Sequence, residues 1–341
     1  LYQRAEAMFS LELSETQRLI QQTAREFAQA EIEPGSIERD LTGEFPYEIV
    51  RKLGELGFMG MMVAPEWGGA GLDTVSYALA LVEISRADAS VGVIMSVNNS
   101  LVCWPIEVYG TQDQKERYLR DLATGQKLGA FCLSEPEAGS DATQQHTTAV
   151  RTDGGWILNG TKNWITNGTT ADVYVVFAQT DRSKGHRGIT AFLIEKGTEG
   201  FVPGKKEDKL GIRSSDTCSI GLTNVFVPDA NVLGDIGEGF RIAMNTLNGG
   251  RIGIAAQAVG IAQAAFDAAL AYSQQRKTFG KPICEHQAIQ FKLADMSVKL
   301  EAARLLLLRA AYLRDRGERY IQAASQAKLF ASKVAVEIAL E

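Results

Sequence analysis

The sequence predicts an α+β protein that is mainly helical, in which helices come first, strands follow and helices return. Apolar residues recur at helical spacing over the first third of the chain, and short β-prone runs separated by turn residues begin near Gln126. Long stretches rich in alanine and leucine then follow Gly239. Strands and helices do not alternate, which argues against a doubly wound nucleotide-binding fold.

Residues 1–127 are predicted to form an N-terminal helical domain. The series Ser14-Glu15-Thr16-Gln17 has the pattern of a capping box and should begin the first long helix. Pro46 should open another helix over residues 46–58, and a glycine-rich connector follows at 64–73. Thr111 and Gln114 repeat the capping-box pattern before a further helix.

Residues 128–236 are predicted to form a central β domain, as a small antiparallel barrel or sandwich. The series Asp153-Gly154-Gly155 indicates a hairpin between two of the strands. The expected strands cover residues 128–134, 147–152, 156–166, 172–180, 188–196 and 225–234.

Residues 237–341 are predicted to form a C-terminal helical bundle domain, with long helices over 240–273, 286–316 and the final stretch. The last helical pattern reaches Glu341 without a cap or a Gly or Pro stop, and residue 1 is Leu. We therefore expect the chain to be incomplete at its C-terminus and trimmed at its start.

Composition excludes several classes of function. The chain has 35 basic and 41 acidic residues and a net charge of -6, so no nucleic-acid partner is expected. Its four cysteines are scattered and read as reduced core residues of an intracellular protein. The three histidines lack metal-ligand spacing, and charged residues interrupt the apolar runs, so neither a metal site nor a membrane span is expected.

The stretch FCLSEPEAGSDA, residues 131–142, carries the first candidate site. It begins as a strand and ends in hydroxyl and acidic residues around a proline and a glycine. Such a loop can offer hydroxyls and backbone N–H groups to a ligand, or can be an ordinary turn. Glu135, Glu137 and Asp141 could pair for acid–base chemistry, although capping and solvation are the commoner roles.

Further candidates each have a plain alternative. An indole at Trp164 and a hydroxyl at Thr166 share one side of an extended strand and suit a flat heteroaromatic ligand, or they simply cover a sheet. The break RKTFGKPI, with Arg276 and nearby Gln287, suits a phosphate or is a helix–helix turn. Arg251 beside glycines could meet a substrate or cap a helix. Residues 205–215 read as a charged, solvated connector.

Several of these stretches together resemble the acyl-CoA dehydrogenase family, most closely its short-chain, butyryl-CoA type. They occur in the family's order and spacing, and they read FCLSEPEAGSDA, NGTKNWITNG, KKEDKLGIRSS, GRIGIAAQAVGIAQAAFDAALAYSQQRKTFGKPI and HQAIQFKLADM. The resemblance runs from the first helix to Glu341 and implies a helical domain, a β domain and a four-helix bundle that is cut short here. It also implies FAD, an acyl-CoA substrate, electron-transferring flavoprotein as acceptor and a homotetramer, in the bacterial cytoplasm or the mitochondrial matrix.

The resemblance assigns roles to individual residues. Those implied to bind FAD are Phe131, Leu133, Ser134, Gly139, Ser140, Trp164, Ile165, Thr166, Arg276, Phe279 and Gln287. Of these, Thr166 would hydrogen-bond near the reactive flavin nitrogen, and Arg276, Phe279 and Gln287 would grip the ADP half in a neighbouring subunit. Ser140, Asn248 and Arg251 would contact the acyl-CoA.

The implied reaction is FAD-dependent α,β-dehydrogenation of a short-chain acyl-CoA to a trans-2-enoyl-CoA. One branch of the family has its base at the position of Gly250, where glycine cannot serve, and Glu341 is a poor substitute. The expected base is therefore a glutamate beyond residue 341, and no catalytic residue is expected within the chain. The family often has Asp at the position of Asn248. A non-catalytic flavin- or acyl-CoA-binding homologue and a related flavin oxidase remain alternatives.

Overall fold

The computed structural model describes residues 12–341, which group into two compact units. The first unit holds residues 12–34, 73–87 and 254–341, and the second holds residues 35–72 and 88–253. Each unit is assembled from separate stretches of the chain. The three consecutive domains expected from the sequence therefore stay a prediction.

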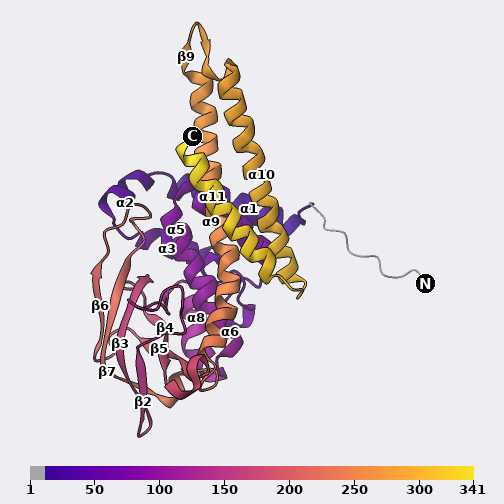
Figure 1. Ribbon diagram of the computed structural model, residues 1–341. Helices are drawn as coiled ribbons and strands as arrows, with labels where there is room; N and C mark the ends of the chain where they lie inside the picture. Colours follow the sequence, from indigo (N-terminus) through magenta and orange to yellow (C-terminus); the bar gives the residue numbers. More distant parts are fainter. Residues whose placement is uncertain (1–11) are drawn as a thin grey trace, which may run out of the picture. The chain divides into compact units, whose positions relative to one another are not determined.

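The first unit is entirely helical apart from one short hairpin, within the described residues. Its helices are α1 (Glu15–Phe27), α4 (Thr74–Ala87), the C-terminal part of α9 (Gly239–Gln275), α10 (Gln287–Asp315) and α11 (Ile321–Leu340). Figure 1 shows α10 and α11 running side by side. The predicted capping box is confirmed, since Gln17 donates its backbone N–H to Ser14 Oγ at 3.1 Å and its side chain accepts from Ser14 N at 3.0 Å.

A glycine allows α4 and α9 to approach closely in this unit. A Cβ atom added to Gly260 would lie 2.5 Å from the backbone oxygen of Val82 and 2.9 Å from the nitrogen of Arg86. Backbone atoms at these distances can move only if the two helices separate. The close crossing therefore requires glycine at this position.

Replacing Gly260 with valine should lower the free energy of unfolding by about 2 kcal/mol, because overpacking outweighs the gain in helix propensity. Urea denaturation followed by circular dichroism measures the change. Gly250→Val is the matched control on the same helix, since its Cβ would meet only the flexible end of Leu101, at 3.0 Å. Equal losses in the two variants would contradict the crossing argument.

The segment between α9 and α10 is a β-hairpin rather than a simple break. Strand β9 (Lys277–Thr278) pairs antiparallel with β10 (Lys281–Pro282), and the 3-10 turn η8 (Ile283–Glu285) leads into α10. Phe279 and Gly280 form the turn with positive φ angles of 50° and 79°. The position of Phe279 normally favours Asn or Gly in such a turn. Figure 1 shows this hairpin projecting at the tip of the two helices.

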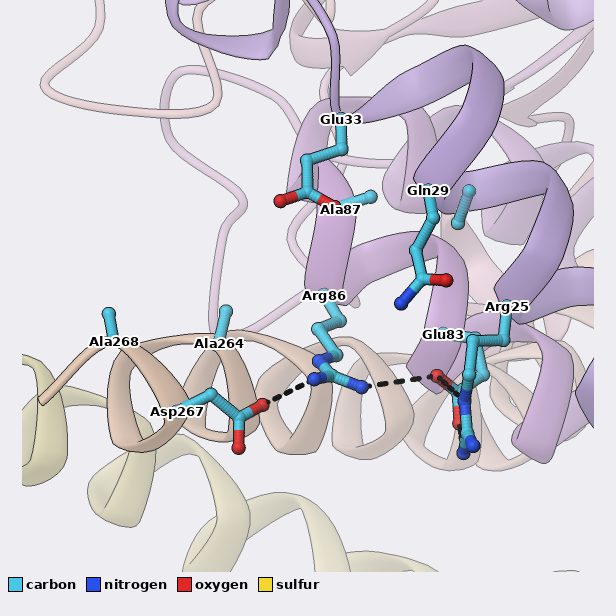
Figure 2. Close-up of a pocket in the computed structure, with 10 residues that line it drawn as sticks. Arg25, Gln29, Glu33, Glu83, Arg86, Ala87, Ala264, Asp267 and Ala268 are labelled. Carbon is cyan, nitrogen blue, oxygen red and sulfur yellow. Dashed lines mark hydrogen bonds and ion pairs between the residues drawn. The ribbon is translucent and has the colours of Figure 1, made fainter. Parts of the chain in front are cut away.

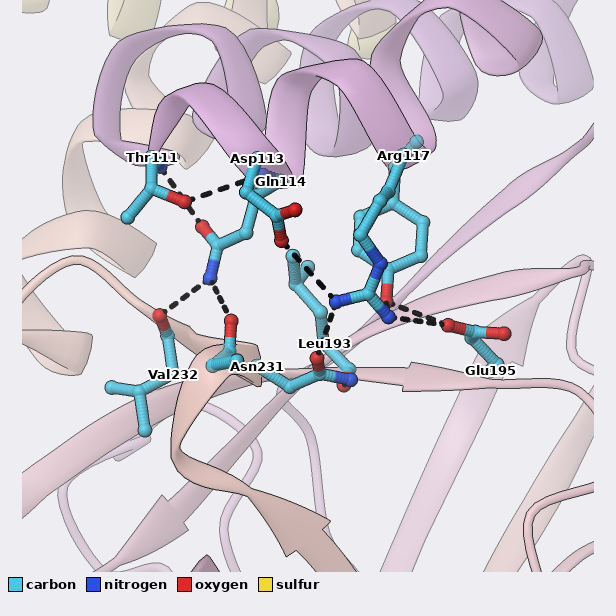
Figure 3. Close-up of polar contacts among 10 residues, drawn as sticks. Thr111, Asp113, Gln114, Arg117, Leu193, Glu195, Asn231 and Val232 are labelled. Carbon is cyan, nitrogen blue, oxygen red and sulfur yellow. Dashed lines mark hydrogen bonds and ion pairs between the residues drawn. The ribbon is translucent and has the colours of Figure 1, made fainter.

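The second unit begins with a set of short helices. They are α2 (Ser36–Thr42), α3 (Tyr47–Glu55), α5 (Ala89–Ser96), α6 (Trp104–Tyr109), α7 (Gln112–Gln114) and α8 (Arg120–Ala123), with π-helical segments at Val97–Cys103 and Lys115–Leu119. Pro46 precedes α3 as predicted, and the capping box of Thr111 and Gln114 is confirmed. The Gln114 side chain also donates to the carbonyls of Ala230 and Val232, each at 2.8 Å (Figure 3). This contact ties the helical part of the unit to its sheet.

The sheet has eight strands. They are β1 (Gly129–Cys132), β2 (Thr148–Thr152), β3 (Gly155–Thr166), β4 (Val173–Gln179), β5 (Ile189–Glu195), β6 (Phe201–Lys206), β7 (Thr217–Pro228) and β8 (Val232–Leu233). The strand order is β6-β7-β3-β2-β4-β5-β8, with β1 paired to β4. The predicted hairpin at Asp153-Gly154 is confirmed. The expectation of a purely antiparallel sheet is wrong, because β1 and β2 both pair with β4 in parallel.

Two hydrophobic cores lie on the two faces of β4. Val173, Val175 and Phe177 face one core, which the helical segments 97–123 and the start of α9 cover. Tyr174 and Val176 face the other core, where β3, β6 and β7 pack against β1, β4 and β5. A strand buried on both sides is expected to be apolar throughout, as VYVVFAQ largely is. The predicted α+β class with a central barrel or sandwich is confirmed.

Two helical stretches are long and apolar enough to cross a membrane, by length and composition alone, among the described residues: Ala89–Tyr109 and α9. The expectation that no stretch meets this test is therefore wrong, because the interrupting charges are too sparse in these windows. In the apolar window of the first, 78% of residues are buried inside the protein, and in that of the second, 39%. Helices that fill a protein core pass the same test.

Candidate active site

A buried lysine organises the loop that follows β1. Lys162, on β3, is 0% exposed, and its Nζ donates to the carbonyl of Leu133 at 3.2 Å, to Glu135 Oε1 at 2.7 Å and to Gln145 Oε1 at 3.3 Å. Glu135 in turn accepts the backbone N–H groups of His146 and Thr147, at 2.5 and 3.2 Å. One ammonium group therefore fixes both ends of the loop 133–147.

The buried pair has perturbed pKa values. Burial lowers the pKa of Lys162, although the Glu135 charge opposes this effect. For Glu135, burial opposes ionisation most strongly, but the Lys162 charge together with the donated hydrogen bonds holds the pKa below its ordinary value of 4.5. The Glu135 carboxyl group is therefore ionised at neutral pH, and it pairs with Lys162 at 2.7 Å. The sequence interpretation of Glu135 as a capping or solvated residue is wrong, because its partner lies 27 positions away.

The same strand presents an indole to solvent through a β-bulge. Its register against β7 shifts between Lys162 and Ile165, and Trp164 has a φ of 60° with a side chain that is 64% exposed. Bulges of this kind re-aim a side chain, and the positive φ of a bulky residue costs on the order of 1–3 kcal/mol. The bulge therefore sets the direction of the indole, and the placement of Trp164 and Thr166 on one side of a ligand stays a prediction.

The chain just after the bulge is fixed by a buried carboxylate. Asp216, which is 2% exposed, accepts hydrogen bonds from the backbone N–H and the hydroxyl of Thr169, both at 2.6 Å, and from the hydroxyl of Thr170 at 2.8 Å. Asn167, at a φ of 61°, donates its side-chain amide to the carbonyl of Gly129 at 3.0 Å. These contacts hold the strained backbone in one conformation.

The residues around the indole offer polar groups with no partner. Within residues 12–341, neither the hydroxyl of Ser134 nor that of Thr166 forms a hydrogen bond, although Asn163 donates its N–H to the carbonyl of Ser134 at 2.9 Å. Gly139 and Ser140 are exposed at the tip of the loop, and a Cβ added to Gly139 would meet nothing within 4 Å. An aromatic face, two hydroxyls and an open glycine fit a flat heteroaromatic ring.

Three of the residues predicted to bind FAD have side chains that pack in the protein core. Ile165 is 1% exposed and its side chain belongs to the core, so only its backbone is available to a ligand, and its place beside one stays a prediction. Leu133 is 7% exposed and belongs to the core beneath the loop. The half-buried Phe131 stacks edge-on against Phe177 at 5.0 Å between ring centroids.

Asn248 and Arg251 occupy one turn of α9. The Asn248 side-chain oxygen accepts a hydrogen bond from the Arg251 guanidinium, and both residues are half-buried. No carboxylate among the described residues pairs with Arg251. Gly250 lies between them and faces Leu101, so this turn carries no acidic side chain.

A cleft of about 340 Å³ lies at the end of the loop 133–147. Its lining includes the basic or titratable side chains of His146, Arg182 and His186. Gln145 also lines the cleft, is 1% exposed and has an amide nitrogen without a partner in the described part of the chain. These groups suit a phosphate-bearing ligand.

The remaining predicted residues lie in the first unit. Arg276, Phe279 and Gln287 are exposed on or beside the β9–β10 hairpin, and Phe279 is 98% exposed. Phe279 also has a positive φ, and strained backbone of this kind clusters at ligand sites.

A second cavity of about 340 Å³, in the first unit, is lined by charges that already neutralise one another. Figure 2 shows Arg25 and Arg86 on either side of Glu83, with Asp267 beyond Arg86. The ion-pair distances are 2.8 Å from Arg25 to Glu83 and 2.6 Å from Arg86 to Asp267. We therefore assign this cavity a structural role.

The charged loop 205–215 is anchored rather than free. Arg213 forms an ion pair with Asp40 at 2.9 Å, and Lys209 donates to the carbonyl of Ser215 at 2.6 Å. Lys206 donates to the carbonyl of Gly43. The interpretation of a solvated connector is therefore wrong for these side chains, because Arg213 and Lys206 pair with acceptors far away in the sequence and Lys209 with an acceptor within the loop.

Sequence reasoning missed Lys162, Asn167 and Asp216. A lysine in the middle of an otherwise strand-like run was a usable signal for Lys162, since an alternating strand places it on the same side as the buried Leu158. Asp216 had no comparable signal, because its partners lie 46 and 47 positions away.

Models of three family domains match this chain. They are the acyl-CoA dehydrogenase N-terminal domain over residues 14–126, the middle domain over 130–225 and the C-terminal domain over 237–341. The short-chain specific acyl-CoA dehydrogenase of Bos taurus mitochondria is 52% identical over 329 residues, which cover 96% of this chain and 80% of that protein.

Two solved structures are also close. Butyryl-CoA dehydrogenase from Megasphaera elsdenii has a TM-score of 0.95 and 46% identity, over 97% of this chain and 87% of that one. A structure described as an electron-transferring flavoprotein of Acidaminococcus fermentans, studied for flavin-based electron bifurcation, also has a TM-score of 0.95, with 49% identity and the same coverage.

Proposed function

Because this chain belongs to the acyl-CoA dehydrogenase family, we propose that it oxidises a short-chain acyl-CoA to the trans-2-enoyl-CoA with bound FAD. The observation that carries the proposal is the exposed indole of Trp164, held at a positive φ beside two unpartnered hydroxyls. Strain of this kind persists where the surrounding structure over-determines it, and it clusters at ligand sites.

The described residues fit FAD. Trp164 would stack on the flavin ring, while the hydroxyls of Ser134 and Thr166 would hydrogen-bond its polar edge. The open position of Gly139 lets the backbone approach a ligand closely. Arg276, Phe279 and Gln287 would bind the ADP half of FAD in a neighbouring subunit, which accounts for the exposure of Phe279. When bound, FAD supplies the acceptor for the hydride that leaves the substrate.

The substrate would be held by its polar parts. Ser140 and the turn with Asn248 and Arg251 would bind the chain of the acyl-CoA, while the cleft lined by His146 and Arg182 would take its anionic nucleotide end. Asn248 accepts a hydrogen bond from Arg251 without neutralising it, so the guanidinium keeps its full positive charge.

Removal of the weakly acidic proton next to the thioester needs a carboxylate whose basicity is raised by an apolar surrounding. Glu135 forms a buried ion pair with Lys162, and Gly250 has no side chain, so neither can act as the base. We propose that a glutamate outside residues 12–341 supplies this base. The residues described here would bind and orient the substrate, exclude water and position hydrogen-bond donors for the developing negative charge.

Electron-transferring flavoprotein is the proposed electron acceptor, and a homotetramer is the proposed assembly. The proposed location is the cytoplasm of a bacterium or the mitochondrial matrix of a eukaryote.

The acyl chain preference tests the substrate class. We expect the protein, expressed from its complete reading frame, to reduce an electron-accepting dye with butyryl-CoA at a higher kcat/KM than with octanoyl- or palmitoyl-CoA. Free butyrate should give no turnover, because it lacks the nucleotide end. A preference for palmitoyl-CoA would contradict the short-chain assignment. Rapid reoxidation of the reduced protein by air would favour an oxidase instead.

A further inference from the structure

We propose that Lys162 is a positioning residue that sets the flavin-facing conformation of both the loop 133–147 and the Trp164 bulge. The inference rests on the proposed function, since it concerns the same site. Lys162 itself is 0% exposed, so it acts through the groups to which it donates hydrogen bonds.

The hydrogen bonds of Lys162 converge on the backbone that would face the ring. Its Nζ binds the carbonyl of Leu133 directly, at 3.2 Å, and Ser134 is the next residue. The following residue of the strand, Asn163, donates its N–H to the carbonyl of Ser134 at 2.9 Å. The strand and the loop are therefore joined at two consecutive positions, immediately before Trp164.

The location of the pair also explains how the strain at Trp164 is maintained. Lys162 fixes the strand two residues before the indole, and Asp216 fixes the chain at Thr169 and Thr170, after it. A positive φ at a bulky residue relaxes unless both sides are held. Removing the anchor on one side should let the bulge sample extended conformations.

Stability alone does not account for the pair. A buried ion pair can often be replaced by apolar residues at little or no cost, so its presence is weak evidence for a stabilising role. Here the carboxylate also accepts hydrogen bonds from the N–H groups of His146 and Thr147, and the ammonium donates one to the carbonyl of Leu133. These contacts fix directions in the backbone that two apolar side chains could not fix.

The test compares two variants that differ in the ammonium group. Lys162→Met with Glu135→Gln removes both charges, so that no unpaired charge is buried. Glu135→Gln alone keeps the ammonium and its bond to Leu133. Arg39→Met, which breaks the ion pair with Asp88 at 3.1 Å, is the control for loss of a largely buried pair elsewhere in the second unit.

We expect the double variant to bind FAD about tenfold more weakly than the wild type and to show a shifted visible circular dichroism band of the bound flavin. In the apo form, amide hydrogen exchange over residues 161–168 should rise at least tenfold. Glu135→Gln should weaken FAD binding less than threefold, and Arg39→Met should leave binding and the flavin band unchanged.

A folded double variant with wild-type FAD affinity, flavin band and exchange would overturn the positioning role and leave the proposed function standing. If the double variant does not fold, Lys162→Met with Glu135→Leu takes its place, because an apolar pair of similar volume can often replace a buried ion pair at little cost. Wild-type FAD affinity, an unshifted flavin band and wild-type exchange over residues 161–168 in that variant would also overturn the positioning role. A wild-type protein that takes up no FAD would overturn both proposals.

Discussion

Replacing Trp164 with alanine is expected to weaken FAD binding by about 30-fold or more. Truncation of a central aromatic anchor typically costs about 2 kcal/mol or more, which corresponds to this factor. The same substitution should leave the free energy of unfolding of the apoprotein unchanged or raised, because the indole is 64% exposed and alanine carries less strain at a φ of 60°. Fluorescence titration of the apoprotein with FAD measures the first effect, and urea denaturation measures the second.

Phe226→Ala provides the matched control for this variant. Phe226 is an aromatic residue on β7 that is 46% exposed, and it pairs with Ile157 at the opposite end of the β3–β7 ladder from Thr166. We expect wild-type FAD affinity from this control. If Trp164→Ala binds FAD as tightly as Phe226→Ala does, the indole is not part of the flavin site.

Replacing Glu135 with glutamine should lower the free energy of unfolding by about 3–5 kcal/mol at pH 7, since it leaves the ammonium of Lys162 buried without a counter-charge. The pKa of Glu135 is lower in the folded protein than its ordinary value of 4.5. Its contribution to stability is therefore fully present above pH 4.5 and is lost as the pH falls through the folded pKa.

The difference between wild type and Glu135→Gln should consequently be constant from pH 7 to 5 and shrink below pH 4.5. Chemical denaturation at a series of pH values measures it. Glu137→Gln is the control, because Glu137 is exposed and its one ion pair within residues 12–341 is with the exposed His146, at 2.9 Å. A difference that stayed undiminished well below pH 4.5 would contradict this role of the ionised carboxylate.

Local signals in the sequence predicted much of the fold. The capping boxes at Ser14 and Thr111 and the hairpin at Asp153-Gly154 depend on residues within a few positions of one another, so a single sequence contains the whole interaction. Strand β6 was missed because FVPGKK contains a proline and a glycine, and it is held by pairing with β7 rather than by its own propensity.

The sequence predicted which residue types form the candidate site, but it did not predict the contacts that hold them in place. The motif around Ser134 and the indole of Trp164 were visible as residue types. The strained bulge was not, because a positive φ at tryptophan is opposed by local preference and is imposed by tertiary contacts. The partners that impose it, Lys162 with Glu135 and Asp216 with Thr169, are 27 and 47 positions apart in the sequence.

The most direct test of the central claim is an anaerobic titration of the purified protein, expressed from its complete reading frame and saturated with FAD. We predict a yellow protein whose flavin absorbance is bleached by a stoichiometric amount of butyryl-CoA, with formation of the trans-2-enoyl thioester. A protein that stays colourless in excess FAD, or a yellow protein that no acyl-CoA bleaches, would contradict the account.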